Sequence, residues 1–281
     1  MVQWKLRPVI LTQSPPRDES DLSKRKTTSS KSDSGKIAAA KGAKLIATRG
    51  MGMPIKLFRH EGVTMTADQI VKAFKQYPYN PKSKTSIVAG FGKVTSSGEV
   101  VAADFVSGFK VQVMTFEGAP VHYISVDSGT AIIKLDRGTI EVRGSDRIAR
   151  KFRGVFEDVV GGKLSPLDLN GGTVKLYNSA TDVASVLLIG VEKGNITQAE
   201  FRGAGIQREE DIGMYQRRYK GQIGRFRGTF AYPSGAFLTT TVNAEAGSLM
   251  VYRSGEGILE KDLNWIVELM EDAALTHGQG N

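Results

Sequence analysis

Hydrophobic positions recur at helical spacing in the first third of the chain. Thr66 and Gln69 have the spacing of a capping box, which satisfies the free N–H groups at a helix start. The pattern predicts a helix that begins at Thr66 and ends before Pro78. Its inward face would consist of Ala67, Ile70, Val71 and Phe74.

Two further helices are predicted near the chain ends. An Ala-rich, proline-free stretch favours a helix over about residues 35–48. A second stripe predicts a helix over about residues 257–275, with acidic side chains on its outer face. The apolar positions of this C-terminal stripe have spacings of four, three and four: Leu259, Leu263, Ile266 and Met270.

The middle of the chain changes to a two-residue repeat. Apolar and polar side chains alternate over residues 109–114, which is typical of a half-buried strand. The tripeptides Asp-Ser-Gly at 127–129 and Asp-Arg-Gly at 136–138 have turn chemistry, so we predict antiparallel hairpins. Strands are predicted on either side of these turns, over residues 121–126, 131–135 and 139–142.

Two glycine pairs, at 161–162 and 171–172, mark a possible boundary between two halves of this region. Strands are predicted over residues 173–177, 196–201, 223–232 and 237–242. Residues 183–191 fit a buried strand or a short helix. In the strand over 223–232, Phe226, Gly228, Phe230 and Tyr232 would pack on one face, and the other would present Arg225, Arg227 and Thr229.

These patterns predict an α+β fold, predominantly antiparallel β, with a sandwich- or barrel-like body and a few helices. We expect a disordered basic arm with an apolar tip over residues 1–36, and a basic helical segment over 37–85 that leads into the body. The β-rich body would cover 86–253, and 254–281 would form the acidic amphipathic C-terminal helix.

The charge is unevenly distributed. Residues 1–59 contain 13 basic and 4 acidic side chains, a net +9 that equals the net charge of the whole protein. Residues 254–281 contain 6 acidic side chains and 1 basic. The polar segment 12–36 has too little apolar surface to offset the entropy of ordering it. The contrast in charge also suggests a head-to-tail contact between copies.

Basic clusters indicate a polyanion partner, either nucleic acid, RNA in particular, or an anionic membrane surface. Aromatic side chains accompany the clusters, and Tyr215 and Tyr219 are candidates for base stacking. The apolar tip, with Trp4, Leu6 and Ile10, could dock a partner or pair as a first strand. The candidate polyanion-binding residues are Lys24, Arg25, Lys26, Lys36, Lys41, Lys44, Arg147, Arg150, Lys151, Arg153, Arg217, Arg218, Lys220, Arg225 and Arg227.

No catalytic motif is present. The chain has no cysteine, which excludes disulfides, thiolate metal sites and cysteine nucleophiles. Neither a Walker A loop, a GxSxG elbow nor an HExxH pair occurs. The three histidines are far apart, and a His122–Asp127 pair reads better as structural than catalytic. We therefore predict no catalytic residue, no cofactor and no metal site.

The hypothesis that best fits these observations is a non-enzymatic structural or assembly protein that self-associates and binds a polyanion. Viral matrix, nucleocapsid and coat proteins share this organisation, which is an analogy of architecture and not of motif. Two alternatives remain: a scaffold or adaptor that docks a protein through its N-terminal peptide, and an enzyme or ligand-binding β protein with an unrecognised pocket. Without a signal peptide or an apolar run long enough to span a bilayer, we expect the protein in the cytoplasm, the nucleus or a virion.

Overall fold

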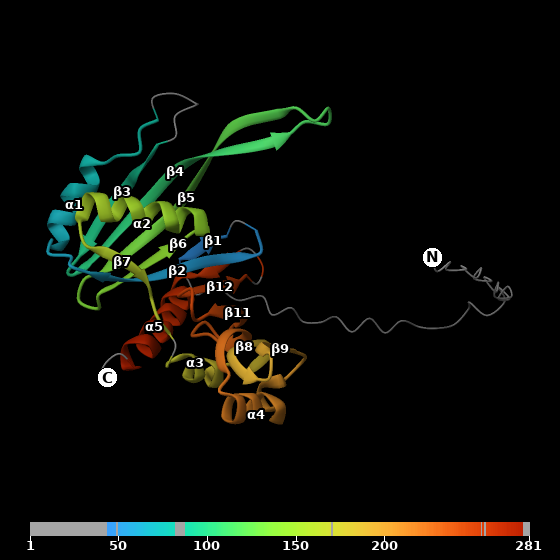
Figure 1. Ribbon diagram of the computed structural model, residues 1–281. Coiled ribbons are helices and arrows are strands. Elements are labelled where there is room, and N and C mark those ends of the chain that lie inside the picture. Colours follow the sequence, from blue (N-terminus) through green and yellow to red (C-terminus); the bar gives the residue numbers. More distant parts are fainter. Residues whose placement is uncertain are drawn as a thin grey trace, which may run out of the picture. The chain divides into compact units, whose positions relative to one another are not determined.

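The computed structural model describes residues 44–48, 50–81, 88–169, 171–253, 255 and 257–277. The predicted arm, its apolar tip and most of the predicted Ala-rich helix lie outside the described residues. The described chain is mostly antiparallel β-sheet with five α-helices (Figure 1).

The elements alternate between runs of strands and single helices. The first part contains β1 (Leu45–Ala47), β2 (Gly52–Glu61), α1 (Ala67–Gln76), β3 (Ala89–Ser97), β4 (Val100–Met114), β5 (Pro120–Lys134), β6 (Thr139–Arg143) and α2 (Asp146–Val160). The second contains β7 (Lys163–Pro166), α3 (Thr173–Ser179), β8 (Asp182–Lys193), β9 (Ile196–Arg202), α4 (Glu210–Tyr219), β10 (Gln222–Ala231), β11 (Phe237–Asn243), β12 (Ser248–Tyr252), β13 (Gly257–Leu259) and α5 (Glu260–His277).

One open sheet of eleven strands forms the centre of the fold. Its order is β3-β4-β5-β6-β2-β12-β11-β10-β8-β9, and β7 also pairs with β2. All of these pairings are antiparallel. β1 and β13 form a separate two-stranded sheet. The large sheet does not close on itself, so the sandwich- or barrel-like shape expected from the sequence is not confirmed.

Two hydrophobic cores lie on opposite faces of this sheet and meet at β2. Adjacent residues of a strand point to opposite faces. Phe58 of β2 belongs to the core under α1 and α2, whereas Ile55 and Leu57 belong to the core that contains α5 and α3. Helices therefore cover one face of β3–β6 and the other face of β8–β12. On the remaining face of β3–β6, α5 covers Thr139 and Arg143 of β6, and no described helix lies over the remaining face of β8–β12.

The predicted helix after Thr66 is confirmed. Thr66 is the N-cap of α1, and both hydrogen bonds of its capping box with Gln69 are formed. The face with Ala67, Ile70 and Phe74 is buried. The helix ends at Gln76, before Pro78.

The helix predicted over 35–48 is wrong where the structure describes it. Leu45, Ile46 and Ala47 form β1, which pairs with β13. The C-terminal helix is confirmed, but it starts three residues later than predicted, because Gly257–Leu259 form that partner strand. The Ala-rich composition alone favours a helix, but pairing with β13 satisfies the backbone N–H and C=O groups of β1 in a sheet instead.

The predicted turn at Asp-Ser-Gly 127–129 is also wrong, since β5 continues through it as a single strand of 15 residues. Asp127 accepts hydrogen bonds from Ser145 and Arg147 at the start of α2. Gly129 allows a close approach of backbone, because a Cβ there would lie 2.5 Å from the carbonyl oxygen of Arg143. The residues that resembled a turn instead join β5 to α2.

Residues 173–177, predicted as a strand, belong to helix α3. Thr173, Leu176 and Tyr177 are buried at helical spacing, and the Thr173 hydroxyl donates to the carbonyl of Leu169. The ambiguous segment 183–191 is a strand, within β8. The strands predicted over 196–201, 223–232 and 237–242 correspond to β9, β10 and β11.

The acidic outer face predicted for the C-terminal helix needs correction. Asp262 and Glu271 are buried. Glu271 accepts hydrogen bonds from Lys134 and from the Thr139 hydroxyl, and Asp262 accepts one from the backbone N–H of Ser234. Carboxylates that would otherwise face solvent thus attach α5 to the strands beneath it.

Candidate polyanion interface

The alternation predicted for β10 is confirmed, and it places two arginines on a sheet face without a helix. Phe226 and Phe230 are buried in the second core, and Arg225 and Arg227 project from the opposite side. In neighbouring strands, the same side carries partly exposed polar side chains: Thr239, Thr241, Asn243 and Ser248. No helix of the described residues covers these side chains.

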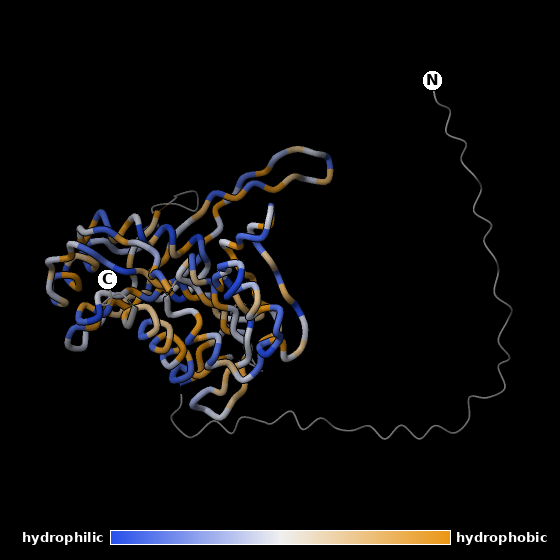
Figure 2. The backbone as a smooth tube through the Cα atoms, turned by 60° about the horizontal axis from the view of Figure 1, so that its bottom comes forward, coloured by the Kyte–Doolittle hydropathy of each residue, from blue (hydrophilic) through white to orange (hydrophobic). Residues whose placement is uncertain are grey.

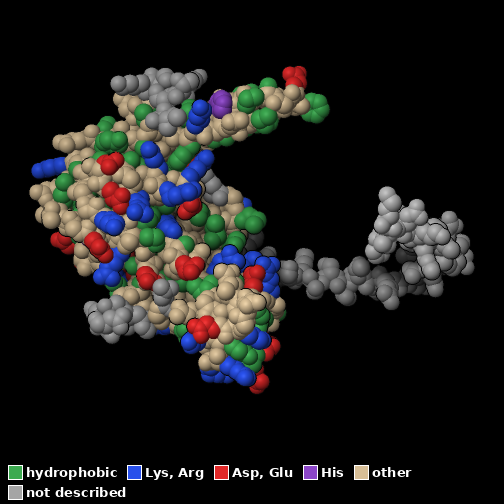
Figure 3. Space-filling model, in the orientation of Figure 1, with side chains coloured by type: hydrophobic (Ala, Val, Ile, Leu, Met, Phe, Trp, Pro, Cys, Tyr) green, Lys and Arg blue, Asp and Glu red, His purple; other side chains and the backbone are tan. Residues whose placement is uncertain are grey.

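We call this surface the Arg face and define it by Lys56, Arg202, Arg225, Arg227 and Tyr252, which lie on β2, β9, β10 and β12. Lys and Arg side chains gather in the corresponding part of Figure 3. Because β2 pairs with β12, β12 with β11, β11 with β10, β10 with β8 and β8 with β9, the backbone fixes the spacing of all five residues.

A hollow of about 230 Å³ joins the Arg face to the start of α2. Arg225, Lys56 and Asp146 all line it. Asp146 forms an ion pair of 3.1 Å with Arg150, one turn further along α2. Arg225 of β10 therefore approaches the start of α2, where Arg150 pairs with Asp146.

Lys56 is partly buried between charges of both signs. Burial lowers the pKa of Lys56, and Arg150 acts in the same direction, whereas Asp146 opposes both. An anion that entered the hollow would stabilise the charged ammonium group. Lys56 was not among the candidates from the sequence, although the alternation over β2 places it on this side.

Arg227 lies over an aromatic ring. Its guanidinium carbon is 4.8 Å from the centre of the Tyr252 ring, which is a cation–π contact. The Tyr252 hydroxyl is within 3.5 Å of the Thr241 hydroxyl, which helps to fix the ring. No carboxylate of the described chain pairs with Arg227. Its N–H donors thus remain available to a ligand.

At the edge of the sheet, two arginines share one carboxylate. Arg202 lies 3.0 Å from Glu200, and Arg225 lies 3.8 Å from the same oxygen. All three side chains are substantially exposed, so solvent screens these pairs and each contributes little to stability. One acidic group cannot neutralise both arginines, and this edge of the Arg face keeps a positive charge.

The other predicted residues of α2 do not converge on the Arg face. Arg147 pairs with Asp127 and lies over the Phe109 ring, at 4.8 Å from its centre. Arg153 pairs with Glu157, and Lys151 is exposed. These side chains lie along the surface of α2 and not on the Arg face.

The predicted residues of α4 lie on the side of the sheet opposite the Arg face, because α4 packs on the core that contains Phe226. Lys220 pairs with Glu192 at 2.7 Å, and Arg217 and Arg218 are exposed. The rings of Tyr215 and Tyr219 contact each other, and Lys193 lies over both. Their ring faces are thus already occupied.

Lys44 is the first described residue, and it pairs with Glu260 of α5 at 2.9 Å. The remaining candidates from the sequence lie outside the described residues: Trp4, Leu6, Ile10, Lys24, Arg25, Lys26, Lys36 and Lys41.

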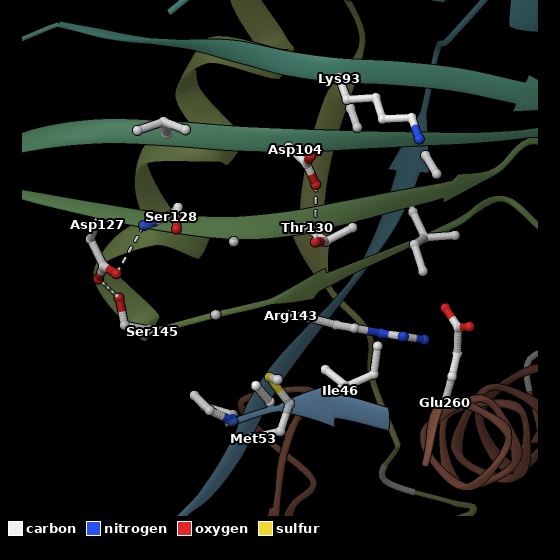
Figure 4. A pocket seen from close by; sticks show the side chains of 18 of the residues that line it. Ile46, Met53, Lys93, Asp104, Asp127, Ser128, Thr130, Arg143, Ser145 and Glu260 are labelled. Carbon is white, nitrogen blue, oxygen red and sulfur yellow. Dashed lines mark hydrogen bonds between the residues drawn. The ribbon is translucent and has the colours of Figure 1, made fainter. Parts of the chain in front are cut away.

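A larger hollow, which we call the groove, lies on the face of the β3–β6 half opposite α1 and α2 and has a volume of about 970 Å³. Figure 4 shows its polar side chains turned toward one another: Asp104 faces the Thr130 hydroxyl, and Asp127 faces Ser145. Burial alone would raise the pKa of Asp127, but hydrogen bonds from Ser145, Arg147 and Ser128 together hold it below its usual value.

The groove gives little support to a catalytic His122–Asp127 pair. The two residues are five apart in β5, so their side chains point to opposite faces of the strand. His122 is exposed opposite Gln112, whereas Asp127 is buried against α2. Within the described residues, no group of three or more His, Asp or Glu side chains is arranged to hold a metal ion.

Comparison with protein-family models and with curated proteins finds no match for this chain. Of the helices in the described residues, none combines the length and the hydropathy needed to cross a bilayer.

Proposed function

We propose that this protein is a non-enzymatic structural or assembly protein that self-associates and binds nucleic acid, RNA in particular, through the Arg face together with the basic arm. The observation that carries the proposal is the placement of Arg225 and Arg227 on a sheet face that no described helix covers. The Tyr252 ring and Lys56 lie on the same face.

The chemistry of the Arg face suits a phosphate backbone. Guanidinium groups bind phosphate oxygens with two parallel hydrogen bonds, and they release counterions when they do so. The hydroxyl and amide groups of Thr241, Asn243 and Ser248 lie between the basic side chains and can contact phosphate or ribose. Such contacts give tight binding that depends little on the base sequence of the nucleic acid.

A single strand fits this face better than a duplex or a membrane. Arg227 over Tyr252 forms a planar platform on which an unpaired base can stack. A membrane-binding surface normally adds exposed apolar side chains to its basic groups. The side chains beside the arginines here are mostly hydroxyls and an amide, with Met250 and the exposed Phe237 as the apolar exceptions.

The test is an affinity measurement with the full-length chain and a fluorescent single-stranded RNA. Arg225→Ala with Arg227→Ala should weaken binding by about tenfold to a hundredfold, and should lower the salt slope by nearly two, one for each phosphate contact. Fluorescence anisotropy across a salt series measures both quantities.

The matched control removes the same charge from the opposite side. Arg217→Ala with Arg218→Ala should change the affinity by only about twofold, as expected for a long-range effect under salt screening. Equal losses in the two double variants would contradict a role for the Arg face. Vesicles with phosphatidylserine in place of RNA test the membrane alternative.

The arm has a separate test. Deletion of residues 1–36 removes basic side chains, so RNA binding should weaken and become less dependent on salt. Binding that is unchanged by this deletion would remove the arm from the proposal and leave the Arg face alone.

A further inference from the structure

The hairpin of β4 and β5 extends beyond the rest of the sheet. Ser107 is the last residue of β4 that pairs with β3, and Thr130 is the last residue of β5 that pairs with β6. Seven register pairs, from Gly108↔Val126 to Met114↔Pro120, have no neighbouring strand among the described residues. We call residues 108–126 the free hairpin; it projects from the body in Figures 1 and 2.

The free hairpin is hydrophobic on one face and at its tip. Cross-strand pairs on that face are Val111↔Tyr123 and Val113↔Val121. At the tip, Phe116 is 108% exposed. Hydrophobic side chains line the projection in Figure 3. Of the twelve exposed large hydrophobic residues in the described chain, six lie here: Val113, Met114, Phe116, Val121, Tyr123 and Val126.

This surface is large enough for a specific contact. Val113, Val121 and Tyr123 share one face, Met114 and Val126 lie on the other, and Phe116 is at the tip. Together the six expose on the order of 600 Å² of apolar area, since one aromatic side chain alone contributes about 150–250 Å². A groove that encloses the hairpin contacts both faces, and a stable interface buries about 800 Å² on each partner. Exposed apolar area of this extent often marks an interaction site.

The groove offers a complementary surface. Its carboxylates and most of its basic side chains are paired within the chain, as in Asp104 with Thr130 and Lys44 with Glu260. What remains for a ligand is partly buried apolar surface from Ile46, Met53 and Val106, and one unpaired cation. That cation is Lys93, which has no carboxylate partner among the described residues. The only acidic residue of the free hairpin is Glu117, which follows Phe116 at the tip.

The contact must be formed between two copies. The groove reaches the base of the hairpin at Val106 and Ser128, and the tip lies seven residues away along a continuous strand. Seven residues of strand span about 20 Å, so the tip cannot reach its own groove. We infer that the free hairpin of one copy docks in the groove of a second copy, with Phe116 and Met114 on the apolar lining and Glu117 next to Lys93.

This inference rests on the self-association included in the proposed function and supplies its contact. Two different surfaces meet, so the assembly is either a dimer in which each copy docks its hairpin in the other, or a head-to-tail ring or filament. A membrane is a poorer occupant, because the charge at the tip is acidic and anionic lipids attract basic residues.

The first experiment is sedimentation velocity of the nucleic-acid-free full-length chain over a range of concentrations. Phe116→Ser should weaken self-association by more than tenfold, as for a central aromatic anchor. Because Phe116 is fully exposed, we expect Phe116→Ser to fold as the wild type does, and circular dichroism checks this. Phe237→Ser is the matched control, because Phe237 is 66% exposed but lies on β11. Equal effects of the two variants, or a wild type that stays monomeric, overturn the inference.

A charge reversal tests the pairing itself. Glu117→Lys and Lys93→Glu should each weaken association severalfold at moderate salt, and the double variant should recover most of the loss. No recovery in the double variant overturns the proposed docking. RNA affinity reports on the Arg face and should not change in Phe116→Ser, so failure of one proposal leaves the other measurable. Binding to vesicles that depends on Phe116 would assign the hairpin to a membrane instead.

Discussion

The groove and the Arg face lie on opposite faces of one sheet, and they differ in how their charges are paired. In the groove, Arg143 is buried against Glu141 and also donates to Asn264 of α5 at 2.7 Å. On the Arg face, Arg227 lies over a ring and has no carboxylate partner among the described residues, and Arg225 shares one distant carboxylate. Whether an arginine on a strand has a structural role or is available to a ligand thus depends on the carboxylates that the fold brings near it.

The largest expected effect is on the groove side of this comparison. Arg143→Met leaves Glu141, which is 1% exposed, without its main counter-charge. Breaking a buried pair by removing one partner costs about 3–5 kcal/mol in unfolding free energy. Urea denaturation measures it, and Arg225→Met is the matched control, for which we expect a change below about 0.5 kcal/mol.

The pH dependence gives a second readout of the same variant. Burial raises the pKa of Glu141, and Arg143 opposes this rise. A carboxyl group with a raised pKa in the folded state is destabilising when ionised, so the cost appears as the pH rises above its ordinary value. The deficit of Arg143→Met should therefore shrink on acidification. A deficit that does not depend on pH would show that Glu141 is not its source.

A smaller effect tests the packing at the end of the groove. A Cβ at Gly129 would lie 2.5 Å from the Arg143 carbonyl oxygen and 2.9 Å from the Ile148 side chain. Gly129→Ala should therefore cost about 1–3 kcal/mol, as overpacking does. The control is Gly154→Ala in α2, where a Cβ meets no atom within 4 Å. That change should stabilise the protein by up to about 1 kcal/mol.

The contrast also shows how far the sequence could predict this fold. Local signals succeeded where they were complete within a few residues, as with Thr66 and Gln69 or the alternation around Phe226. They failed where a distant strand decided the outcome. Leu45–Ala47 became a strand because β13 pairs with it, and Gly129 serves a close approach to Arg143 that no local pattern records.

The candidate site was predicted in part for the same reason. Alternation was enough to place Arg225 and Arg227 on one face, but the register of four strands was needed to add Lys56 and Tyr252. Residues 217–220 are close to Arg225 in sequence, yet α4 carries them to the other side of the sheet. The sequence likewise predicted strands at 109–114 and 121–126 without indicating that no third strand covers them.

The smallest expected effect separates charge from stacking on the Arg face. Arg227→Lys keeps the positive charge but loses the planar group over the Tyr252 ring. Because an exposed cation–π contact is worth about 0.5–1 kcal/mol, RNA affinity should fall about twofold to fivefold while stability stays nearly constant. Tyr252→Leu should cause a similar loss, and the two changes should not add, because each removes the same contact. Fully additive losses in anisotropy titrations would mean that Arg227 and Tyr252 bind RNA independently, and the stacked platform would then have no role.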